Sequence, residues 1–385
     1  MRFNTIKLGN VATVSSSKRI FANQYVSEGI PFYRQKEIIC KKNKEEITDP
    51  LYISNETYFE IKSKFGAPKK GDLLITAVGA TLGIPYVVSD EVFYFKDGNL
   101  IWLYNFDKNI NSNYLFYWIS SDIGQKSMWS RIIGSAQPAL TIETIKQFEL
   151  SVPNYETQCK ISDILSSYDN LIENNQKQIK LLEEAAQRLY KEWFVDLRFP
   201  GYENTPIVDG VPDGWKKGML GDIAEFKRGK TITKKQAISG EIPVVAGGKE
   251  PAYWHNISNT EAPVITVSAS GNAGFTRLYY QKVWASDCSY LDNGATENLY
   301  FIYSFLKFKQ NDIYSMQKGA CQQHVNAKEI NGLKTIIPSN DVLEKFRNTI
   351  SCFFEKISIL EQQIKDAKQA RDRLLPKLMS GEIEV

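Results

Sequence analysis

Residues 161–193 read ISDILSSYDNLIENNQKQIKLLEEAAQRLYKEW, and residues 346–378 read FRNTISCFFEKISILEQQIKDAKQARDRLLPKL. Alternate steps of four and three residues meet an apolar side chain at nine of ten positions in each stretch, with Asn175 and Arg371 as the exceptions. Because a 3.5-residue period keeps one stripe of a helix facing a partner, both stretches are predicted to be long helices that pair as a coiled coil. An amphipathic helix lying on its own globular domain is the alternative.

This stripe of ten positions is called the seam of each helix. The first seam consists of Ile161, Leu165, Tyr168, Ile172, Asn175, Ile179, Leu182, Ala186, Leu189 and Trp193. Adding 185 to each number leads to the second seam, which consists of Phe346, Ile350, Phe353, Ile357, Leu360, Ile364, Ala367, Arg371, Leu374 and Leu378.

The two helices belong to two copies of one longer repeat. Ile133–Gln137 recurs 185 residues later as Lys318–Gln322, and Leu8–Ala12 recurs 212 residues later as Leu220–Ala224. Since the offset shrinks between these matches, the first copy is predicted to carry extra loop residues between residues 31 and 75. The simplest interpretation is that one unit has been duplicated and has diverged.

In front of each helix, short β-type runs are separated by Gly, Pro and Asn, with one predicted helix near residues 113–121 and another near 297–307. The predicted fold class is therefore α+β, dominated by strands, with pseudo-twofold symmetry between the copies. The predicted division of the chain is a front domain at 1–152, a long helix at 153–199, a turn-rich linker at 200–215, a second front domain at 216–338 and a second long helix at 339–385.

Length and composition exclude several classes of protein. The chain has 385 residues, of which 43% are hydrophobic and 24% charged, as expected for two or three globular domains. Its five cysteines form no Cys-x-x-Cys pair and it has only two histidines, so a disulfide framework or a metal site is not expected. Without an apolar run long enough to cross a membrane, the prediction is a soluble cytoplasmic protein.

No set of residues in the sequence forms a convincing catalytic site, and the nuclease-like tripeptides Glu60–Lys62 and Asp366–Lys368 are interpreted as surface charge. A phosphate-binding Gly-x-x-x-x-Gly-Lys-Ser/Thr loop, a Gly-x-Gly-x-x-Gly turn and a Gly-x-Ser-x-Gly elbow are all missing. The tetrapeptide Asp49–Tyr52 lacks the second proline of an amino-methyltransferase loop. We therefore predict a chain that is not itself an enzyme.

Local basic segments are the candidates for binding nucleic acid, although the net charge is only +3. The proposed phosphate contacts of the second copy are Lys227, Arg228, Lys230, Lys234, Lys235 and Lys249, with glycines between them. The thinner set in the first copy is Lys18, Arg19, Arg34 and Lys36. A solvated charged loop is the alternative interpretation of either set.

Polar residues at the repeated segments Gly-Ser-Ala-Gln and Gly-Ala-Cys-Gln are candidates for contacts with bases. Glutamine pairs with adenine through two hydrogen bonds, which makes Gln137, Gln322 and Gln323 candidate base readers. His324 is a further candidate for a base contact, and Arg131 and Lys318 are candidates for holding a phosphate or a guanine. Ser270 and Asn272 belong to a separate polar turn that is a candidate for reaching a groove of DNA. The alternative is that these glutamines only cap turns of their own backbone.

The whole chain resembles the DNA-specificity subunit of type I restriction-modification systems. The local matches are Leu181–Tyr202, the closing Arg373–Glu382, and the entry into the first helix at Val152–Gln158. In the second copy, the entry Ile337–Leu343 has no glutamine where the first has Gln158.

This resemblance implies that each front domain is a target-recognition domain for one half of a split sequence in double-stranded DNA. It also implies an antiparallel coiled coil that separates these domains and docks two methyltransferase (modification) subunits. S-adenosylmethionine, ATP and Mg²⁺ are then expected on the modification and restriction/translocase subunits, with no cofactor in this chain. The rival hypothesis is a coiled-coil scaffold that binds proteins and does not read DNA.

Overall fold

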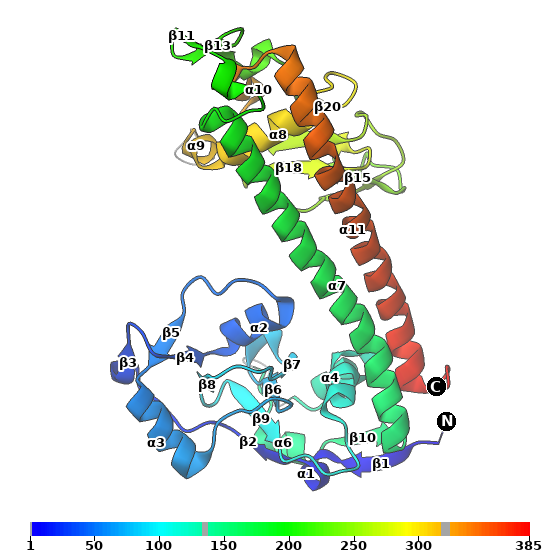
Figure 1. The fold of residues 1–385 in the computed structure, drawn as a ribbon. Helices are drawn as coiled ribbons and strands as arrows, with labels where there is room; N and C mark the ends of the chain where they lie inside the picture. The colour runs from blue at the N-terminus through cyan, green and yellow to red at the C-terminus, as the bar shows by residue number, and fades with distance from the viewer. Residues whose placement is uncertain (1, 133–137, 317–323) are drawn as a thin grey trace. The chain divides into compact units, whose positions relative to one another are not determined.

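The computed structural model describes residues 2–132, 138–316 and 324–385, and it divides into two compact units (Figure 1). Unit 1 comprises Met1–Glu173 and Lys365–Val385, and unit 2 comprises Asn174–Ile364. The division falls within the two long helices, so each unit contains part of both.

Unit 1 is an α+β domain with the first part of one long helix and the last part of the other. Its strands are β1 (Asn4–Lys7), β2 (Thr13–Ser15), β3 (Tyr25–Val26), β4 (Ile30–Tyr33), β5 (Leu51–Ile53), β6 (Leu73–Thr76), β7 (Pro85–Val87), β8 (Tyr94–Phe95), β9 (Leu100–Tyr104) and β10 (Glu149–Val152). Its helices are α1 (Leu8–Val11), α2 (Gln35–Asn43), α3 (Asn55–Phe65), α4 (Ser112–Ser120), α5 (Asp122–Trp129) and α6 (Ile142–Lys146), with 3₁₀ turns at Ala22–Gln24 and Gly79–Thr81.

Unit 2 repeats this arrangement with shorter connections. Its strands are β11 (Ile207–Val208), β12 (Val211–Pro212), β13 (Lys216–Met219), β14 (Lys227–Arg228), β15 (Ile242–Val245), β16 (Tyr253–His255), β17 (Val264–Ser268), β18 (Thr276–Tyr279), β19 (Trp284–Ala285), β20 (Cys288–Asp292) and β21 (Lys334–Ile337). Its helices are α8 (Leu299–Phe308), α9 (Gln310–Ser315) and α10 (Ala327–Asn331), with 3₁₀ turns at Tyr202–Asn204 and Leu220–Asp222.

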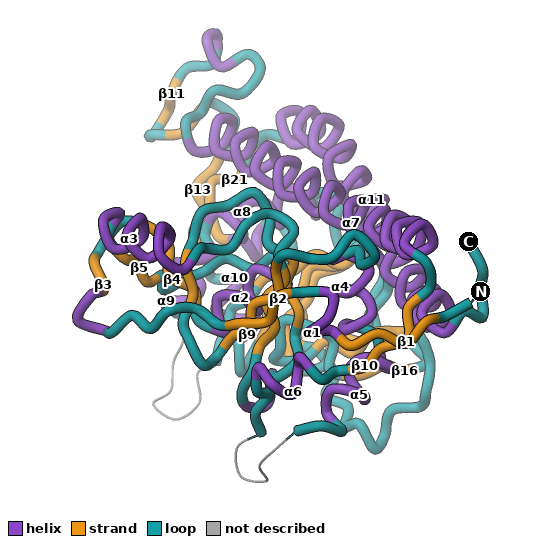
Figure 2. The backbone as a smooth tube through the Cα atoms, turned by 90° about the horizontal axis from the view of Figure 1, so that it is seen from below, coloured by secondary structure: helices purple, strands orange, loops and turns teal. Residues whose placement is uncertain are grey.

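Two long helices pass from one unit to the other. Helix α7 (Tyr155–Tyr190) continues as a π-helical turn at Lys191–Val195, and α11 (Asn340–Ser380) closes the chain. Within each unit, part of α7 lies beside part of α11 (Figures 1 and 2). Figure 2 shows them as two neighbouring purple coils.

The two units share the topology of their main sheet, whereas the second sheet has four strands in unit 1 (β3-β5-β4-β8) and three in unit 2 (β16-β15-β19). The main sheet has the order β2-β9-β6-β7 in unit 1 and β14-β20-β17-β18 in unit 2. Strand β4 pairs in parallel with β8, as β15 does with β19, and β1 pairs with β10 as β13 does with β21. Every residue of the central strands β6 and β17 is buried, as expected for strands covered on both faces. The predicted two-domain α+β fold with two long helices is confirmed.

The extra residues of the first copy form helices, whereas the sequence predicted a loop. Helices α2 and α3 both lie between β4 and β6 and have no counterpart between β15 and β17. Ser54 caps α3 by accepting a hydrogen bond from the Thr57 amide at 3.2 Å, and Glu37 of α2 accepts one from the Arg34 amide at 2.8 Å. Such caps satisfy amides at the start of a helix, and scattered charged residues had masked both helices in the sequence.

Each seam contributes to the core of its unit. In unit 1, Ile161, Leu165 and Leu378 join residues of α4 and the four-stranded sheet in one apolar cluster. In unit 2, the corresponding cluster contains Phe346 and Ile350 together with residues of α8 and β17. Every seam position is buried or half-buried, whereas the off-seam Leu181 and Ile359 are 60% and 53% exposed.

Gln158 is buried at the start of α7 and makes three hydrogen bonds. Its Oε1 accepts from the Asn111 amide at 3.0 Å, and its Nε2 donates to the carbonyls of Asn109 and Pro153 at 3.0 and 2.9 Å. The Asn111 side chain caps α4, so Gln158 joins the beginnings of two helices. The counterpart in the second copy is Leu343, which is also buried but needs no polar partner.

Replacing Gln158 with leucine is expected to lower the free energy of unfolding of unit 1 by about 2–4 kcal/mol, because one buried amide and two carbonyls lose their partner. Chemical denaturation followed by hydrogen exchange of unit 1 peptides measures this loss. The exposed Gln147→Leu is the control and is expected to change stability by less than about 0.5 kcal/mol. Equal stability of the two variants would contradict a structural role for Gln158.

Candidate nucleic-acid interface

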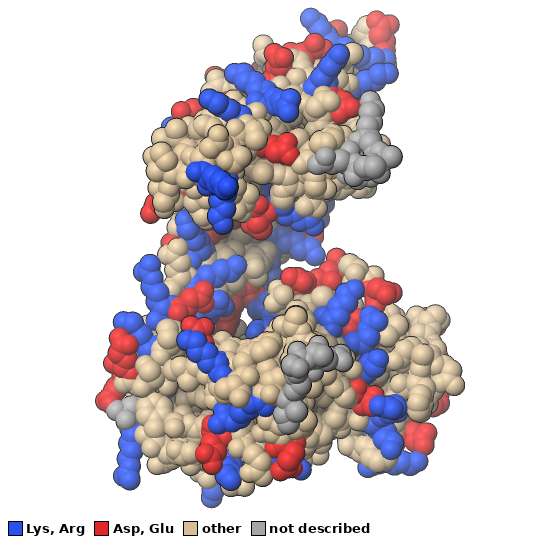
Figure 3. Space-filling model, turned by 180° about the vertical axis from the view of Figure 1, so that it is seen from behind, with Lys and Arg blue, Asp and Glu red and all other residues tan. Residues whose placement is uncertain are grey.

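Basic and acidic side chains are interspersed over the face of each unit drawn in Figure 3. This distribution agrees with the small net charge of +3. An interface for a polyanion must therefore be identified from individual residues rather than from one large charged surface. Of the predicted contacts, Gln137, Lys318, Gln322 and Gln323 lie outside the described residues.

The candidate basic residues of unit 1 are mostly engaged with their own domain. The Arg34 guanidinium pairs at 2.5 Å with Glu37, which is 1% exposed. Arg19 pairs with Asp97 at 2.8 Å, and the Lys18 ammonium lies 5.1 Å from the centre of the Phe65 ring.

The Arg34–Glu37 pair also shifts the ionisation of its members. Burial opposes ionisation of Glu37, but hydrogen bonds from Arg34 hold the pKa of this carboxyl below its ordinary value. Arg34 thus serves to hold a buried carboxylate at the start of α2. Lys36, by contrast, is exposed.

Arg131 also has contacts within unit 1. Its guanidinium donates to the Ser127 carbonyl and hydroxyl, both at 2.9 Å, and lies 4.8 Å from the centre of the Phe148 ring. The side chain is nevertheless exposed, next to the part of the chain that is not described.

The basic residues of unit 2 lie along an edge strand and the loop after it. Strand β14 is at the edge of the four-stranded sheet, with Lys227 opposite Tyr290 and Arg228 opposite Ser289 of β20. These two residues are exposed, and so are Lys230, Lys234 and Lys235. Among the described residues, none of these five side chains has a hydrogen bond or an ion pair, which leaves them available to an anion.

Lys249 lies elsewhere in unit 2. Its ammonium is 5.9 Å from the centre of the Phe275 ring, and its carbonyl accepts a hydrogen bond from Arg277 at 2.8 Å. It lines a pocket with Glu250, Arg277 and other residues that does not include β14. The structure therefore separates Lys249 from the basic edge strand.

The glycines of this region are required by the packing of the chain against itself. A Cβ atom on Gly229 would lie 2.4 Å from the Ser286 carbonyl oxygen, and one on Gly247 would lie 2.5 Å from that of Ser270. Asn272 belongs to the same turn, since its amide donates to the Gly247 carbonyl at 2.9 Å. These close approaches are internal, so the glycines give no argument for a phosphate.

A pocket of about 270 Å³ brings together residues from four separate segments of unit 2. It is lined by Arg228, Ala269, Asp287, Cys288, Ser289, His324, Val325, Asn326 and Ala327. Ser270 lies beside it and donates its hydroxyl hydrogen to Asp287. Cys288 is 1% exposed, and burial raises the pKa of its thiol to about 12, so the thiol stays protonated at neutral pH. Sequence reasoning selected Arg228, His324 and Ser270 but missed Asp287.

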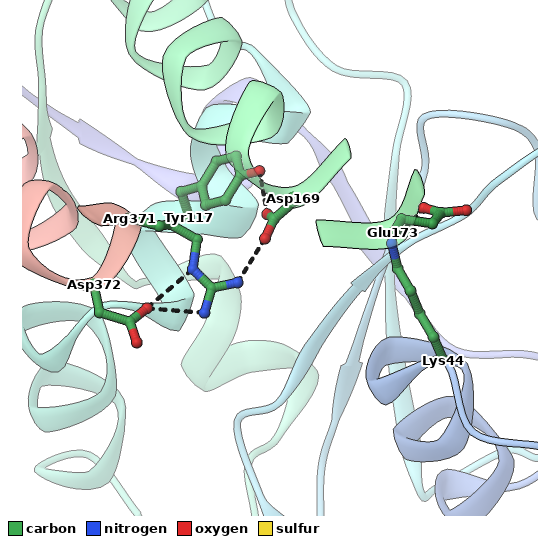
Figure 4. A network of polar contacts seen from close by, with 6 residues as sticks. All are labelled: Lys44, Tyr117, Asp169, Glu173, Arg371 and Asp372. Atoms are coloured by element: carbon green, nitrogen blue, oxygen red, sulfur yellow. Dashed lines mark hydrogen bonds and ion pairs between the residues drawn. The ribbon is translucent and has the colours of Figure 1, made fainter. Parts of the chain in front are cut away.

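The two polar exceptions in the seams both have polar partners. Asn175 is 2% exposed and donates to Gln363 at 3.0 Å in unit 2. In unit 1, Arg371 donates to Asp169 at 2.6 Å, and Asp169 accepts a second hydrogen bond from the Tyr117 hydroxyl at 2.6 Å (Figure 4). Burial and this bond raise the pKa of Tyr117.

The same side of α7 carries an ion pair between Glu173 and Lys44, the residue that ends α2 (Figure 4). The residue that follows α2 thus contributes a cation to the surface of α7 in unit 1. Metal-binding groups of three or more His, Cys, Asp or Glu residues are not found in the described part of the chain. Nor does any helix among residues 2–132, 138–316 and 324–385 have the length and apolar character needed to cross a membrane.

The repeated α+β domains and long helices define a two-domain protein of a known family. Residues 2–184 and 212–369 match the type I restriction modification DNA specificity domain, and the chain belongs to this family. It is thus a specificity subunit, the class of protein that recognises the DNA target in type I restriction-modification systems. The resemblance inferred from the sequence is confirmed.

Individual relatives support the same assignment. The chain is 29% identical over 302 residues to the type I restriction enzyme MjaIX specificity subunit of Methanocaldococcus jannaschii, covering 71% of this chain and 69% of the relative. It is 22% identical to the HindI specificity subunit of Haemophilus influenzae, covering 82% and 87%. The crystal structure of the S subunit from M. genitalium superposes with a TM-score of 0.66 at 16% identity, covering 98% and 96%, and shows the shared fold.

Proposed function

We propose that this chain reads a bipartite target in double-stranded DNA, with one half recognised by each α+β domain. The repeated topology supports this, because two copies of one domain suit two half-sites. The observation that carries the proposal is the set of five basic side chains at β14 and its following loop, which have no partner among the described residues. The division into domains at 1–152 and 216–338, with long helices at 153–199 and 339–385, remains part of this proposal.

The proposal includes an antiparallel coiled coil as a spacer between the two domains. In unit 2, Asn175 contacts Gln363, and Trp193 lies 5.5 Å from Phe346 between ring centres, so residue numbers rise along α7 as they fall along α11. The pair Asp169–Arg371 of unit 1 fits the same register. In this register, the residue numbers of two facing seam positions add up to 539. Leu165 of α7 and Leu374 of α11 are one such pair. This arrangement is the basis of the proposed pseudo-twofold symmetry.

Partner subunits complete the proposed activity. Two modification subunits dock on this chain and bring S-adenosylmethionine, and restriction/translocase subunits bring ATP and Mg²⁺. The chain itself contributes recognition of the target and no catalysis, in the cytoplasm where the DNA lies. A protein-binding scaffold without DNA readout is the competing function, and binding to duplex DNA decides between the two.

Replacing Lys234 or Lys235 with alanine is expected to weaken binding to all duplexes alike. Each phosphate contact that is lost reduces the slope of log K against log[salt] by about 1. The measurement is a titration of the full-length chain, with its modification subunits, on duplex DNA at several salt concentrations.

The control is Lys282→Ala, which removes the same charge from unit 2 but from an ion pair with Glu261 at 2.6 Å. We expect its salt slope to stay at the unmodified value. Equal slopes for the test and control variants would contradict phosphate contacts at the loop after β14. Failure of the unmodified complex to bind any duplex would favour the scaffold.

A further inference from the structure

The pocket beside β14 contains a cation without a partner among the described residues, together with a carboxylate. Arg228 lines the pocket from the edge strand, and among the described residues its guanidinium has no hydrogen bond or ion pair. Asp287 lines the same pocket just before β20. Its Oδ2 accepts a hydrogen bond from the Ser270 hydroxyl, and its Oδ1 has no donor in the described part of the chain. Because no ion pair within 4.0 Å joins Arg228 and Asp287, the two groups do not neutralise each other directly.

This combination suits the edge of a base pair better than a phosphate. A carboxylate in the pocket repels a phosphate group, so the pocket differs from a site built only from cations. In the major groove, a G·C pair presents O6 and N7 of guanine as acceptors and the N4 amino group of cytosine as a donor. Arginine is the usual partner of the first two atoms, and a carboxylate accepts from the third.

We propose that this pocket of unit 2 takes the major-groove edge of a G·C base pair, with Arg228 donating to guanine O6 and N7 and Asp287 accepting from cytosine N4. The inference rests on the proposed reading of DNA and specifies one position of one half-site. It assigns Arg228 to a base, whereas the sequence had placed it among phosphate contacts. His324, on another segment that lines the pocket, is a polar neighbour of this position.

The equivalent place in unit 1 has the same backbone and different side chains. The Ala269 amide donates to the Asp287 carbonyl at 3.1 Å, just as the Ala77 amide donates to the Asn99 carbonyl at 2.8 Å. The offset of 212 places Ser16 where unit 2 has Arg228, and the Ser16 hydroxyl donates to the Leu100 carbonyl at 2.9 Å. Unit 1 therefore lacks both the guanidinium and the carboxylate, and the G·C preference belongs to the half-site of unit 2 alone.

The test is to select duplexes from a randomised library with the full-length chain and its modification subunits. The Arg228→Lys variant keeps the charge but loses the planar guanidinium with its two parallel N–H donors. We expect this variant to lose the preference for G·C at one position of one half-site. Affinity for the unmodified target is expected to fall on the order of 10- to 100-fold, with the other half-site and binding to random DNA unchanged. The Asp287→Asn variant is expected to relax the same position.

A phosphate site would behave differently. Asp287→Asn would then strengthen binding to every sequence, because a repulsive charge is removed, and Arg228→Lys would leave the selected sequence unchanged. Either result overturns the assignment. The control is Lys227→Ala on the same strand, whose side chain points to the other face and which is expected to leave the selected sequence as it is. Thermal melting checks that each variant is folded.

Failure of the proposed function gives a distinct result. If the unmodified complex selects no sequence at all, the proposed reading of DNA is wrong, and so is the assignment of the pocket. If the unmodified complex selects a target and both pocket variants select the same target, only the assignment of the pocket is wrong.

Discussion

Replacing Phe346 with alanine is expected to lower the free energy of unfolding of unit 2 by about 3–5 kcal/mol, the usual cost of truncating a fully buried aromatic side chain. Phe346 is 0% exposed. Its ring lies 4.8 Å from that of Phe194, 5.5 Å from Trp193 and 6.2 Å from Phe301, measured between centres. One side chain of α11 thus joins the end of α7 to α8, and alanine would leave a cavity among all three.

Hydrogen exchange measures this effect on unit 2 by itself, which matters because a chain of two units need not unfold in one step. The matched control is Ile359→Ala on the same helix, where the side chain is 53% exposed and off the seam. We expect this control to change stability by less than about 0.5 kcal/mol. Similar losses in both variants would contradict the seam assigned to α11.

Lengthening both helices by one heptad is expected to lengthen the gap between the two half-sites by about three base pairs. Seven residues add roughly 10 Å of helix at about 1.5 Å per residue, and base pairs are about 3.4 Å apart. The insertions belong after Lys177 and after Glu361, because these points face each other in the proposed register. Whole heptads preserve both seams and retain the contact between Asn175 and Gln363.

Selection of targets from a randomised library with the full-length chain and its modification subunits gives the gap directly. Affinity is expected to fall, because three added base pairs rotate the second half-site about the DNA axis. The added heptads do not produce a matching rotation of the helix pair. The control is a heptad after Lys177 alone, which leaves seven residues of one helix without a partner and is expected to abolish binding. A doubly lengthened chain that selects the original gap would refute the helix pair as a spacer.

The family, the two α+β domains and the two long helices were predictable from the sequence, since each depends on local patterns. A seven-residue apolar period specifies the buried face of a helix whatever it packs against. The repeat likewise revealed that β14 and β2, or β17 and β6, have equivalent places, because duplicated segments keep their fold. Helices α2 and α3 were not predicted, because charged residues outnumber the buried Ile38 and Tyr58 that pack these helices into the core. Their caps and the pair Arg34–Glu37 likewise follow no apolar period.

The polar contacts were decided only by the tertiary structure. Arg34 looked like a phosphate contact until the fold placed it against buried Glu37, and Gln158 gained its role from Asn109 and Asn111 on a distant turn. The pocket of unit 2 joins Arg228 to Asp287 and His324, which are 59 and 96 residues further along the chain. A charged side chain is suited to a ligand only where the fold leaves it without a partner, and this depends on contacts between residues that no local pattern connects.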